Sequence, residues 1–271
     1  MAPGLTGRPT RHPSEPTPPM LWAIISDLHA NIPALEAVLR DIERRRADQI
    51  LCLGDVIGYG PQPRETLQRA REWQLNLLGN HEHAALYYAE DFNERARIAL
   101  DWTRSQLNSK DFPPEENSRL WEFIDGMQER SQIENALLVH GSPRDPVREY
   151  MLPRDARDSA KMAEIFERFL PGCGFCFVGH SHVPGVYTEQ PSFLAPARVP
   201  QGFTLQGGKA LINVGSVGQP RDGDVRASYA TYDGETVWFH RVEYDFRVTQ
   251  RRIVETNVLP HYLARRLEEG R

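Results

Sequence analysis

Short apolar runs alternate with amphipathic stretches over residues 21–78, and this alternation constrains the fold more than any other feature of the chain. The runs and stretches follow one another as Leu21–Ser26, Ile32–Arg46, Gln49–Leu53, Pro63–Glu72 and Leu75–Leu78. Such a βαβαβ order predicts a largely parallel sheet with helices on its faces. The chain is therefore expected to be an α/β protein.

The pattern changes twice beyond this region. Residues 82–130 carry apolar positions at helical spacing, which predicts a helical cap or insertion. Strands then return, and the last two flank Asp233-Gly234, a strong hairpin signal, so the second half is expected to be more antiparallel. These later strands are predicted at Ala136–Val139, Phe175–Val178, Val183–Tyr187, Ala210–Val214, Ala227–Tyr232 and Thr236–Val242.

The two ends of the chain differ from its middle. Residues 1–19 are rich in proline and almost free of apolar side chains, so we predict a disordered tail before one main domain, residues 20–271. Residues 244–271 are expected to form a C-terminal helical segment, because Leu259, Leu263 and Leu267 lie on one helical stripe.

Composition limits the surroundings in which the chain works. With 40% hydrophobic residues, 25% charged residues and a net charge of −5, it is typical of a globular protein without the basic surface that nucleic-acid binding requires. No apolar stretch reaches the roughly 20 residues of a membrane helix. Cys52, Cys173 and Cys176 are too few for a disulfide framework and are interpreted as core residues, which favours a reducing, cytoplasmic location. The sequence leaves open whether the chain forms a homo-oligomer.

Polar side chains follow five of the predicted strands directly, at the carboxyl end where open α/β sheets place their sites. Imidazole together with carboxylate suits Mn, Fe, Zn, Ni or Co. One such residue means little, but its repetition after five strands indicates a metal site. We also expect the Asp-x-His and His-x-His pairs to chelate, because alternate residues of an extended segment point to one side. The residues are Asp27, His29, Asp55, Asn80, His81, His140, His180 and His182.

The blocks around these residues read D-x-H, G-D, G-N-H-E, H and G-H-x-H, in that order. This arrangement resembles the calcineurin-like metallophosphoesterase family over roughly residues 20–247, and within it the small bacterial phosphodiesterase branch. The resemblance implies a four-layer α/β/β/α sandwich of two mixed sheets flanked by helices, with two divalent metal ions. It assigns Asp27, His29 and His182 to one ion and Asn80, His140 and His180 to the other, with Asp55 between them.

The implied chemistry is phosphoester hydrolysis. Two cations held roughly 3.5–4 Å apart can share a hydroxide that attacks phosphorus. Mn²⁺ is the expected metal, with Fe, Zn, Ni or Co as alternatives. Asp55 has the two oxygens that a bridging ligand needs. His81 is expected to stabilise the transition state or protonate the leaving oxygen, and the alternative is an orienting role. Glu82 is interpreted as a helix-start residue.

Three positions depart from the phosphoprotein phosphatases of the family. Gly58 stands where those enzymes have an aspartate, and Tyr59 and Leu78 stand where they have arginines. A monoester dianion needs more positive charge than a diester monoanion, so the sequence favours phosphodiesters. A phosphomonoesterase or phosphoprotein phosphatase with replacement arginines is the alternative. A non-catalytic scaffold is a remote third, because no metal-site residue is missing.

The substrate is expected to be a small or nucleotide-like phosphoester. Arg144 and Arg221 lie in Gly/Pro-rich loops and are candidate substrate contacts, with structural ion pairs as the alternative. Asn31, which closes the Ser-Asp-x-His-x-Asn run of the bacterial branch, is the third candidate.

Overall fold

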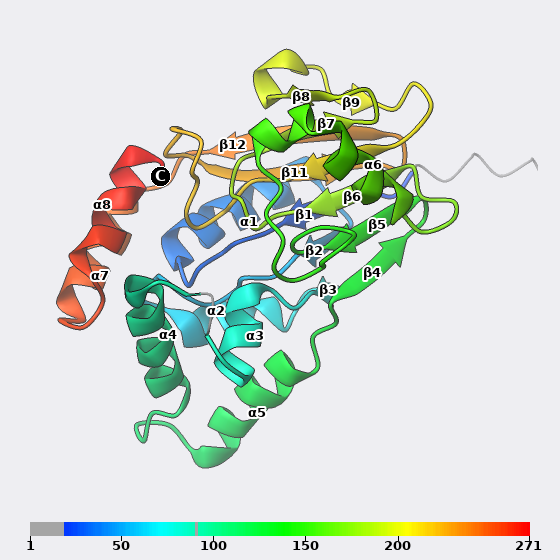
Figure 1. Cartoon of the computed structure of the whole chain (residues 1–271). Helices are drawn as coiled ribbons and strands as arrows, with labels where there is room; N and C mark the ends of the chain where they lie inside the picture. The colour runs from blue at the N-terminus through cyan, green and yellow to red at the C-terminus, as the bar shows by residue number, and fades with distance from the viewer. Residues whose placement is uncertain (1–18, 90–91) are drawn as a thin grey trace, which may run out of the picture.

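Two six-stranded sheets form the centre of the molecule in a computed structural model that describes residues 19–89 and 92–271 (Figure 1). The predicted tail, residues 1–19, lies outside the described residues except for its last position. The first sheet has the order β3-β2-β1-β11-β12-β9 and the second has the order β4-β5-β6-β10-β7-β8.

Both sheets are mixed, as predicted. In the first, β1 pairs parallel with β2 and antiparallel with β11. In the second, β10 pairs parallel with β6 and antiparallel with β7. The strands of the first sheet are β1 (Trp22–Ile25), β2 (Gln49–Cys52), β3 (Leu75–Asn76), β9 (Phe203–Thr204), β11 (Ala227–Tyr232) and β12 (Thr236–Val242). Those of the second are β4 (Arg130–Ile133), β5 (Ala136–Val139), β6 (Phe175–Val178), β7 (Gly185–Thr188), β8 (Ser192–Leu194) and β10 (Ala210–Asn213).

Helices cover the outer faces of both sheets, which confirms the predicted sandwich of helices and two sheets (Figure 1). Those against or near the first sheet are α1 (Ile32–Arg45), α2 (Pro63–Ala70), α3 (Asn80–Leu86), α4 (Glu94–Leu107), α5 (Pro114–Asp125), α7 (Phe246–Glu255) and α8 (His261–Glu269). The second sheet is covered by α6 (Ser159–Glu167) and the 3₁₀ turn η1 (Pro153–Arg157), and a second turn, η2 (Pro196–Arg198), follows β8.

Alternation along β1 divides its side chains between two cores. Trp22 and Ile24 pack in the core between the sheets, whereas Ala23 and Ile25 pack on the helix side. Each fully buried large apolar side chain contributes about 1.5–3 kcal/mol. A slip of one residue would exchange the two faces, so burial fixes the register. The position of Asp27, two residues after the strand, is fixed with it.

The N-terminus of α1 shows why this helix begins where it does. The Asn31 Oδ1 accepts a hydrogen bond from the Ala34 N–H at 3.3 Å, and Pro33 occupies the first turn. Both features stabilise a helix start, because the first N–H groups of a helix have no partner within it. The loop that carries Asp27 and His29 is therefore short and anchored at both ends.

Several elements differ from the prediction. β3 ends at Asn76 rather than at Leu78, because the Leu78 N–H bonds the Gln128 carbonyl at 2.8 Å and the chain leaves the sheet. The strands β4, β8 and β9 were not predicted. β4 alternates between exposed and half-buried residues, and β9 is only two residues long, so neither has an apolar run.

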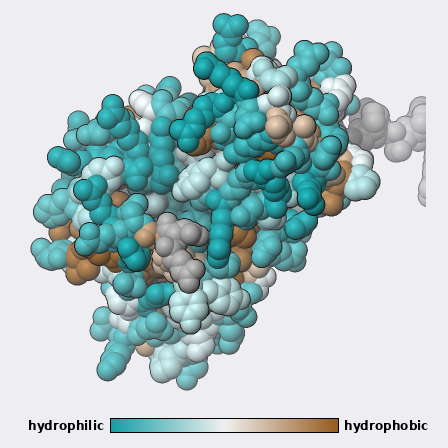
Figure 2. Space-filling view, viewed as in Figure 1, coloured by the Kyte–Doolittle hydropathy of each residue, from teal (hydrophilic) through white to brown (hydrophobic). Residues whose placement is uncertain are grey.

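Residues 82–130 contain the end of α3 and the helices α4 and α5, and residues 244–271 contain α7 and α8. Among the described residues, no helix is both long and apolar enough to cross a membrane. The face seen in Figure 2 is mainly hydrophilic, with apolar residues in small separate patches.

Candidate metal centre

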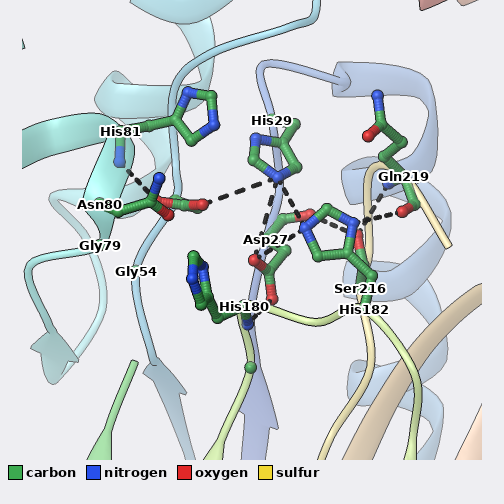
Figure 3. A network of polar contacts seen from close by, with 12 residues as sticks. Asp27, His29, Gly54, Gly79, Asn80, His81, His180, His182, Ser216 and Gln219 are labelled. Atoms are coloured by element: carbon green, nitrogen blue, oxygen red, sulfur yellow. Dashed lines mark hydrogen bonds and ion pairs between the residues drawn. The ribbon is translucent and has the colours of Figure 1, made fainter. Parts of the chain in front are cut away.

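Five strands deliver the seven predicted metal ligands to one end of the two sheets. Asp27 and His29 follow β1, and Asp55 follows β2. Asn80 opens α3 just after β3, His140 follows β5, and His180 and His182 follow β6. Figure 3 shows side chains from these segments turned toward one another. The structure thus brings together residues that lie up to 155 positions apart in the printed sequence, Asp27 and His182.

The donor atoms form two groups that share one residue. Asp27, His29, Asp55 and His182 place one donor atom each within 4.8 Å of one another, and so do Asp55, His140 and His180. The Asn80 Oδ1 lies 3.2 Å from the His140 Nε2 and so belongs to the second group. This is the division that the family resemblance implied.

Asp55 faces both groups through a single oxygen. Its Oδ2 lies 3.8 Å from the His29 Nε2 and 3.4 Å from the His140 Nε2. Its Oδ1 instead accepts a hydrogen bond from the His81 backbone N–H at 2.9 Å. Asp55 therefore presents one oxygen to both groups, while its other oxygen fixes the carboxylate in place.

Each of the four imidazoles places one ring nitrogen against a backbone carbonyl. The pairs are His29 Nδ1 with Ile57 at 3.1 Å, His140 Nδ1 with Leu53 at 3.1 Å, His182 Nδ1 with Gln219 at 2.5 Å and His180 Nε2 with Arg148 at 3.0 Å. A carbonyl accepts only, so the nitrogen beside it carries the proton. In the neutral form of each ring, the other nitrogen keeps a lone pair that points into the site.

These lone pairs face each other at hydrogen-bonding distance. The His29 Nε2 lies 3.1 Å from the His182 Nε2, and the His140 Nε2 lies 3.1 Å from the His180 Nδ1. Two neutral rings in this arrangement would set two acceptors against each other, so each pair calls for a proton or a metal ion beside it. The Asp27 Oδ1 is also buried with no hydrogen-bond partner among the described residues. The residues therefore fit a metal at each group.

The charges of the centre also favour a bound metal ion. Burial lowers the pKa values of His29 and His182 well below that of ordinary imidazole and that of His180 to about 3, so these rings are neutral at pH 7. Burial also opposes ionisation of Asp55, but His140 and His81 hold its pKa well below the usual range. Burial would lower the pKa of His140 too, but Asp55 raises it to about 9. The centre thus contains an ionised, buried carboxylate beside a protonated His140 and three neutral imidazoles, and a metal ion bound by His140 would displace that proton.

Five of the seven candidate ligands have a left-handed backbone. Their φ angles are 54° at Asp27, 46° at His29, 53° at Asp55, 61° at His180 and 59° at His182. Both pairs, Asp27 with His29 and His180 with His182, converge as predicted. The predicted reason, an extended backbone, is wrong. Left-handed φ costs a non-glycine residue on the order of 1–2 kcal/mol, and such strain concentrates at functional sites.

His81 is enclosed by aromatic rings and by Gly58. Its ring centroid lies 4.5 Å from that of Tyr59, 4.9 Å from that of His29 and 4.8 Å from that of Phe92. A Cβ on Gly58 would lie 2.0 Å from the His81 Nδ1, a nitrogen that has no hydrogen-bond partner among the described residues. The ring thus fills the space that a carboxylate at position 58 would need. Burial lowers the pKa of His81 to about 4.

Glu82 does more than start a helix. Its Oε2 accepts hydrogen bonds from the Asp55 N–H at 2.8 Å and the Gly79 N–H at 3.1 Å, and its Oε1 accepts from the Ile57 N–H at 2.9 Å. This fully buried carboxylate joins the loop after β2 to the start of α3 and so positions Asp55 beside Asn80. The sequence signal was its place as the third residue of the helix, which permits a capping box but does not reveal the bonds across to the other loop.

Asn31, predicted to contact substrate, is occupied within the fold. Its Nδ2 donates to the Gly218 carbonyl at 2.8 Å, and its Oδ1 accepts from the Ala34 N–H and from the Thr249 hydroxyl at 2.7 Å. The side chain is buried, with 1% of its surface exposed. The structure therefore gives Asn31 the role of tying α1 to α7 and to the loop after β10.

The two predicted arginines have different surroundings. Arg144 forms ion pairs with Glu149 and Glu164, which is the structural alternative considered from the sequence. Arg221 lines a cavity at the edge of the centre, where its guanidinium lies 5.7 Å from the Tyr59 ring. Arg148, which sequence reasoning missed, lines another cavity beside Asn80 and His180.

That second cavity has a volume of about 340 Å³ and is rich in aromatic side chains. Tyr150 forms one of its walls and stacks on His180 at a centroid distance of 3.7 Å. The remaining aromatic walls are Tyr59, Tyr87, Tyr88 and Phe92. A flat organic group bound beside the centre would find rings to pack against here.

Comparison with known proteins places these features in a family. Residues 20–236 match the calcineurin-like phosphoesterase superfamily domain, and the chain belongs to this family. The resemblance inferred from the five motifs is thereby confirmed. A relative, the uncharacterized protein MJ0912 of Methanocaldococcus jannaschii, is 34% identical over 261 residues, which cover 92% of this chain and 98% of the relative.

Two solved structures show the same architecture. A metallophosphoesterase from Sphaerobacter thermophilus is 39% identical, with a TM-score of 0.76 over 93% of this chain and 100% of that chain. The protein PH1004 of Pyrococcus horikoshii OT3 is 19% identical, with a TM-score of 0.71 over 93% of this chain and 99% of that chain, and shares the fold.

Proposed function

We propose that this chain hydrolyses phosphodiesters with the help of two divalent transition-metal ions. One ion would be held by Asp27, His29 and His182, the other by Asn80, His140 and His180, and Asp55 would contact both. The observation that carries this proposal is the pair of facing imidazole nitrogens in each group, 3.1 Å apart, whose partner nitrogens bond to backbone carbonyls. Family membership supports phosphoester hydrolysis.

Two bound divalent ions would make water a nucleophile at neutral pH and neutralise charge that develops on the phosphate oxygens. The chain's own residues orient these ions and the substrate. Asp55 is positioned by the His81 N–H on one oxygen and by Glu82 through its own backbone N–H. This rigidity keeps the shared oxygen between the two groups of donors.

His81 is proposed to act on the substrate as a neutral hydrogen-bond donor. The edge of the ring that carries Nδ1 faces Gly58, which leaves Nε2 as the nitrogen available to an oxygen of the phosphoester. Because Gly58 supplies no carboxylate to stabilise a protonated ring, transition-state stabilisation is favoured over proton donation to the leaving group.

The preference for diesters rests on the neutral side chains at three positions, Gly58, Tyr59 and Leu78. Tyr59 contributes a ring to both cavities beside the centre, and Leu78 is buried. The aromatic cavity also supports a substrate with a flat organic group, such as a nucleotide-like ester. Hydrolysis of monoesters is the second candidate, supported by Arg221 at the edge of the centre.

A paired assay separates the two candidates. Purified protein loaded with Mn²⁺, the metal we expect, is given bis(p-nitrophenyl) phosphate and p-nitrophenyl phosphate in parallel. We expect a higher kcat/KM for the diester, and a strong preference for the monoester would refute the diester proposal. Elemental analysis should find two metal ions per chain.

Asp55→Asn is the matched variant for the metal proposal, because it keeps the shape of the side chain and removes its charge. We expect turnover to fall by at least about a thousandfold, since both ions lose a shared anionic ligand. Near-normal turnover of this variant with metal supplied would contradict the assignment. Circular dichroism should show that the two sheets persist.

We also propose a cytoplasmic location. Cys52, Cys173 and Cys176 are all free thiols buried in the protein, which is typical of proteins in a reducing compartment. Fractionation of cells that express the tagged chain would test this proposal.

A further inference from the structure

Three arginines from distant parts of the chain line one cavity of about 470 Å³ at the edge of the metal centre. Arg95 lies in the first turn of α4, Arg221 in the loop between β10 and β11, and Arg266 in α8. The cavity shares Tyr59, Asn93, Ala96 and Tyr150 with the aromatic cavity described above, so the two cavities adjoin. The arginines therefore lie next to the cavity that reaches Asn80 and His180.

Packing between helices brings these segments together. Ala99 of α4 belongs to one apolar cluster with Leu263 and Leu267 of α8. Tyr59, from the loop after β2, packs partly buried against the same cluster. The cavity is thus built by the tertiary fold, and no local sequence motif marks it.

Aromatic rings hold the three guanidinium groups in place. Arg95 lies 4.2 Å and Arg266 lies 5.6 Å from the centre of the Tyr262 ring, and Arg221 lies 5.7 Å from that of Tyr59. Within the described ranges, none of the three forms an ion pair with an aspartate or glutamate side chain. A ring attracts the cation through its face, so the guanidinium N–H groups that do not donate to Gln219 or Arg271 are available to an anion.

The positive charge in this cavity is only partly balanced. Among the described residues that line it, Glu94 is the one acidic side chain against three arginines, which leaves two positive charges. Burial, together with the nearby charge of Arg221, lowers the pKa of Arg266 to about 10. Two like charges held close together in a partly buried place favour the binding of an anion.

Arg221 connects this cavity to the metal centre. Its guanidinium donates to the Gln219 Oε1 at 2.9 Å, and the Gln219 carbonyl lies 2.5 Å from the His182 Nδ1. Tyr150, which also lines this cavity, stacks on His180. A phosphoester at the metal centre could therefore extend a neighbouring phosphate directly toward the arginines.

We propose that Arg95, Arg221 and Arg266 form a second phosphate subsite, which binds a phosphate group of the substrate that is not hydrolysed. The planar N–H fork of arginine matches the oxygens of a phosphate and gives strong, charge-assisted hydrogen bonds. The subsite rests on the proposed function, because it assumes that the phosphoester to be hydrolysed lies between the two groups of metal ligands. It restricts the preferred substrates to phosphoesters that carry at least one further phosphate.

Calorimetric titration tests the subsite without turnover. The Mn²⁺-loaded protein is titrated with thymidine 5′-diphosphate and thymidine 5′-monophosphate at fixed free Mn²⁺. We expect the wild type to bind the diphosphate at least about tenfold more tightly, and Arg266→Gln to lose most of this ratio. Arg266→Gln also removes a hydrogen bond within the fold, because Arg266 donates to the Arg271 main-chain oxygen at 2.6 Å. Arg95→Gln, on the exposed first turn of α4, is therefore the second variant.

Matched controls are available on the same two helices. Arg97 and Arg265 are exposed and do not line the cavity, so Arg97→Gln and Arg265→Gln should keep the wild-type ratio. Equal affinity of the wild type for both nucleotides would overturn the subsite. The subsite would also be overturned if Arg95→Gln and Arg266→Gln lost affinity for the diphosphate and the monophosphate equally.

Hydrolysis of the p-nitrophenyl esters of the same two nucleotides distinguishes the subsite from the proposed function. Both proposals stand if the wild type hydrolyses both esters with a preference for the diphosphate ester, and if Arg95→Gln and Arg266→Gln lose this preference. If neither ester is hydrolysed but the binding ratio depends on Arg95 and Arg266, the subsite stands and the proposed function fails.

Discussion

Replacing Gly58 by alanine should damage the centre through a steric conflict that the structure allows us to estimate. The added Cβ would lie 2.0 Å from the His81 Nδ1, 2.7 Å from its Cε1 and 2.8 Å from its Cγ. Ordinary carbon–nitrogen contacts need about 3.5 Å, so the imidazole would have to move by about 1.5 Å. Rings on three sides, those of His29, Tyr59 and Phe92, oppose this movement.

Two costs add in this variant. Overpacking of a rigid site costs about 1–3 kcal/mol. Gly58 also has a φ of +89°, and alanine in such a conformation costs about another 1 kcal/mol. We therefore expect Gly58→Ala to lower the free energy of unfolding by about 2–4 kcal/mol. A displacement of His81 by more than 1 Å should also lower kcat by roughly a hundredfold.

Gly172→Ala is the matched control for the backbone. Gly172 has nearly the same φ, +85°, but nothing lies within 4 Å of its added Cβ, so this variant should lose only about 1 kcal/mol. Urea unfolding of both variants gives the comparison. A double-mutant cycle with His81→Ala isolates the clash, because alanine at 81 makes room for the new methyl group. Equal losses in Gly58→Ala and Gly172→Ala, or no recovery in the double variant, would refute the reasoning.

Two further predictions concern charge and metal. Burial would raise the pKa of Asp41, but hydrogen bonds from Arg44, Arg45 and Tyr229 lower it to about 2. A depressed carboxyl pKa stabilises the fold above about pH 4, and this contribution is lost as the pH falls toward 2. Asp41→Asn should thus cost about 2 kcal/mol at pH 7 and about half as much at pH 3, and equal costs at both pH values in urea unfolding would contradict this account. Removal of metal with a chelator should lower Tm, because an ion present at about a hundred times its Kd stabilises the fold by about 2.7 kcal/mol. Scanning calorimetry measures this Tm. A Tm that changes neither on chelation nor on Mn²⁺ addition would count against the metal centre.

The sequence located the central strands because their side chains are buried on both faces. β1, β5, β6 and β10 are fully buried, and a continuous apolar run is what such strands require. β4 and β8 lie at the edges of the second sheet, where partly exposed faces accept polar residues, so no apolar run marked them. These two edge strands were therefore missed for a physical reason.

The convergence of the candidate metal ligands was predictable because the carboxyl ends of neighbouring strands meet. The manner of their convergence was not predictable, since left-handed angles at Asp27 and His29 leave no trace in an Asp-Leu-His sequence. Arg95 and Arg266 could not be found either, because α4 and α8 meet only through tertiary packing. Among the loop arginines, spacing alone did not distinguish Arg144, which is neutralised by two glutamates, from Arg148.

The imidazoles of the centre are oriented by main-chain carbonyls, and this affects how such a site can evolve. No substitution at Leu53, Ile57, Arg148 or Gln219 removes the carbonyl that a histidine faces. Side chains around the centre can therefore diverge widely while the rings keep their direction, as long as the loops keep their path. A saturation screen of these four positions should tolerate many residues and reject chiefly those that bend the backbone, with proline first among them. The candidate metal ligands would therefore keep their directions even where substitutions around the centre change what it binds.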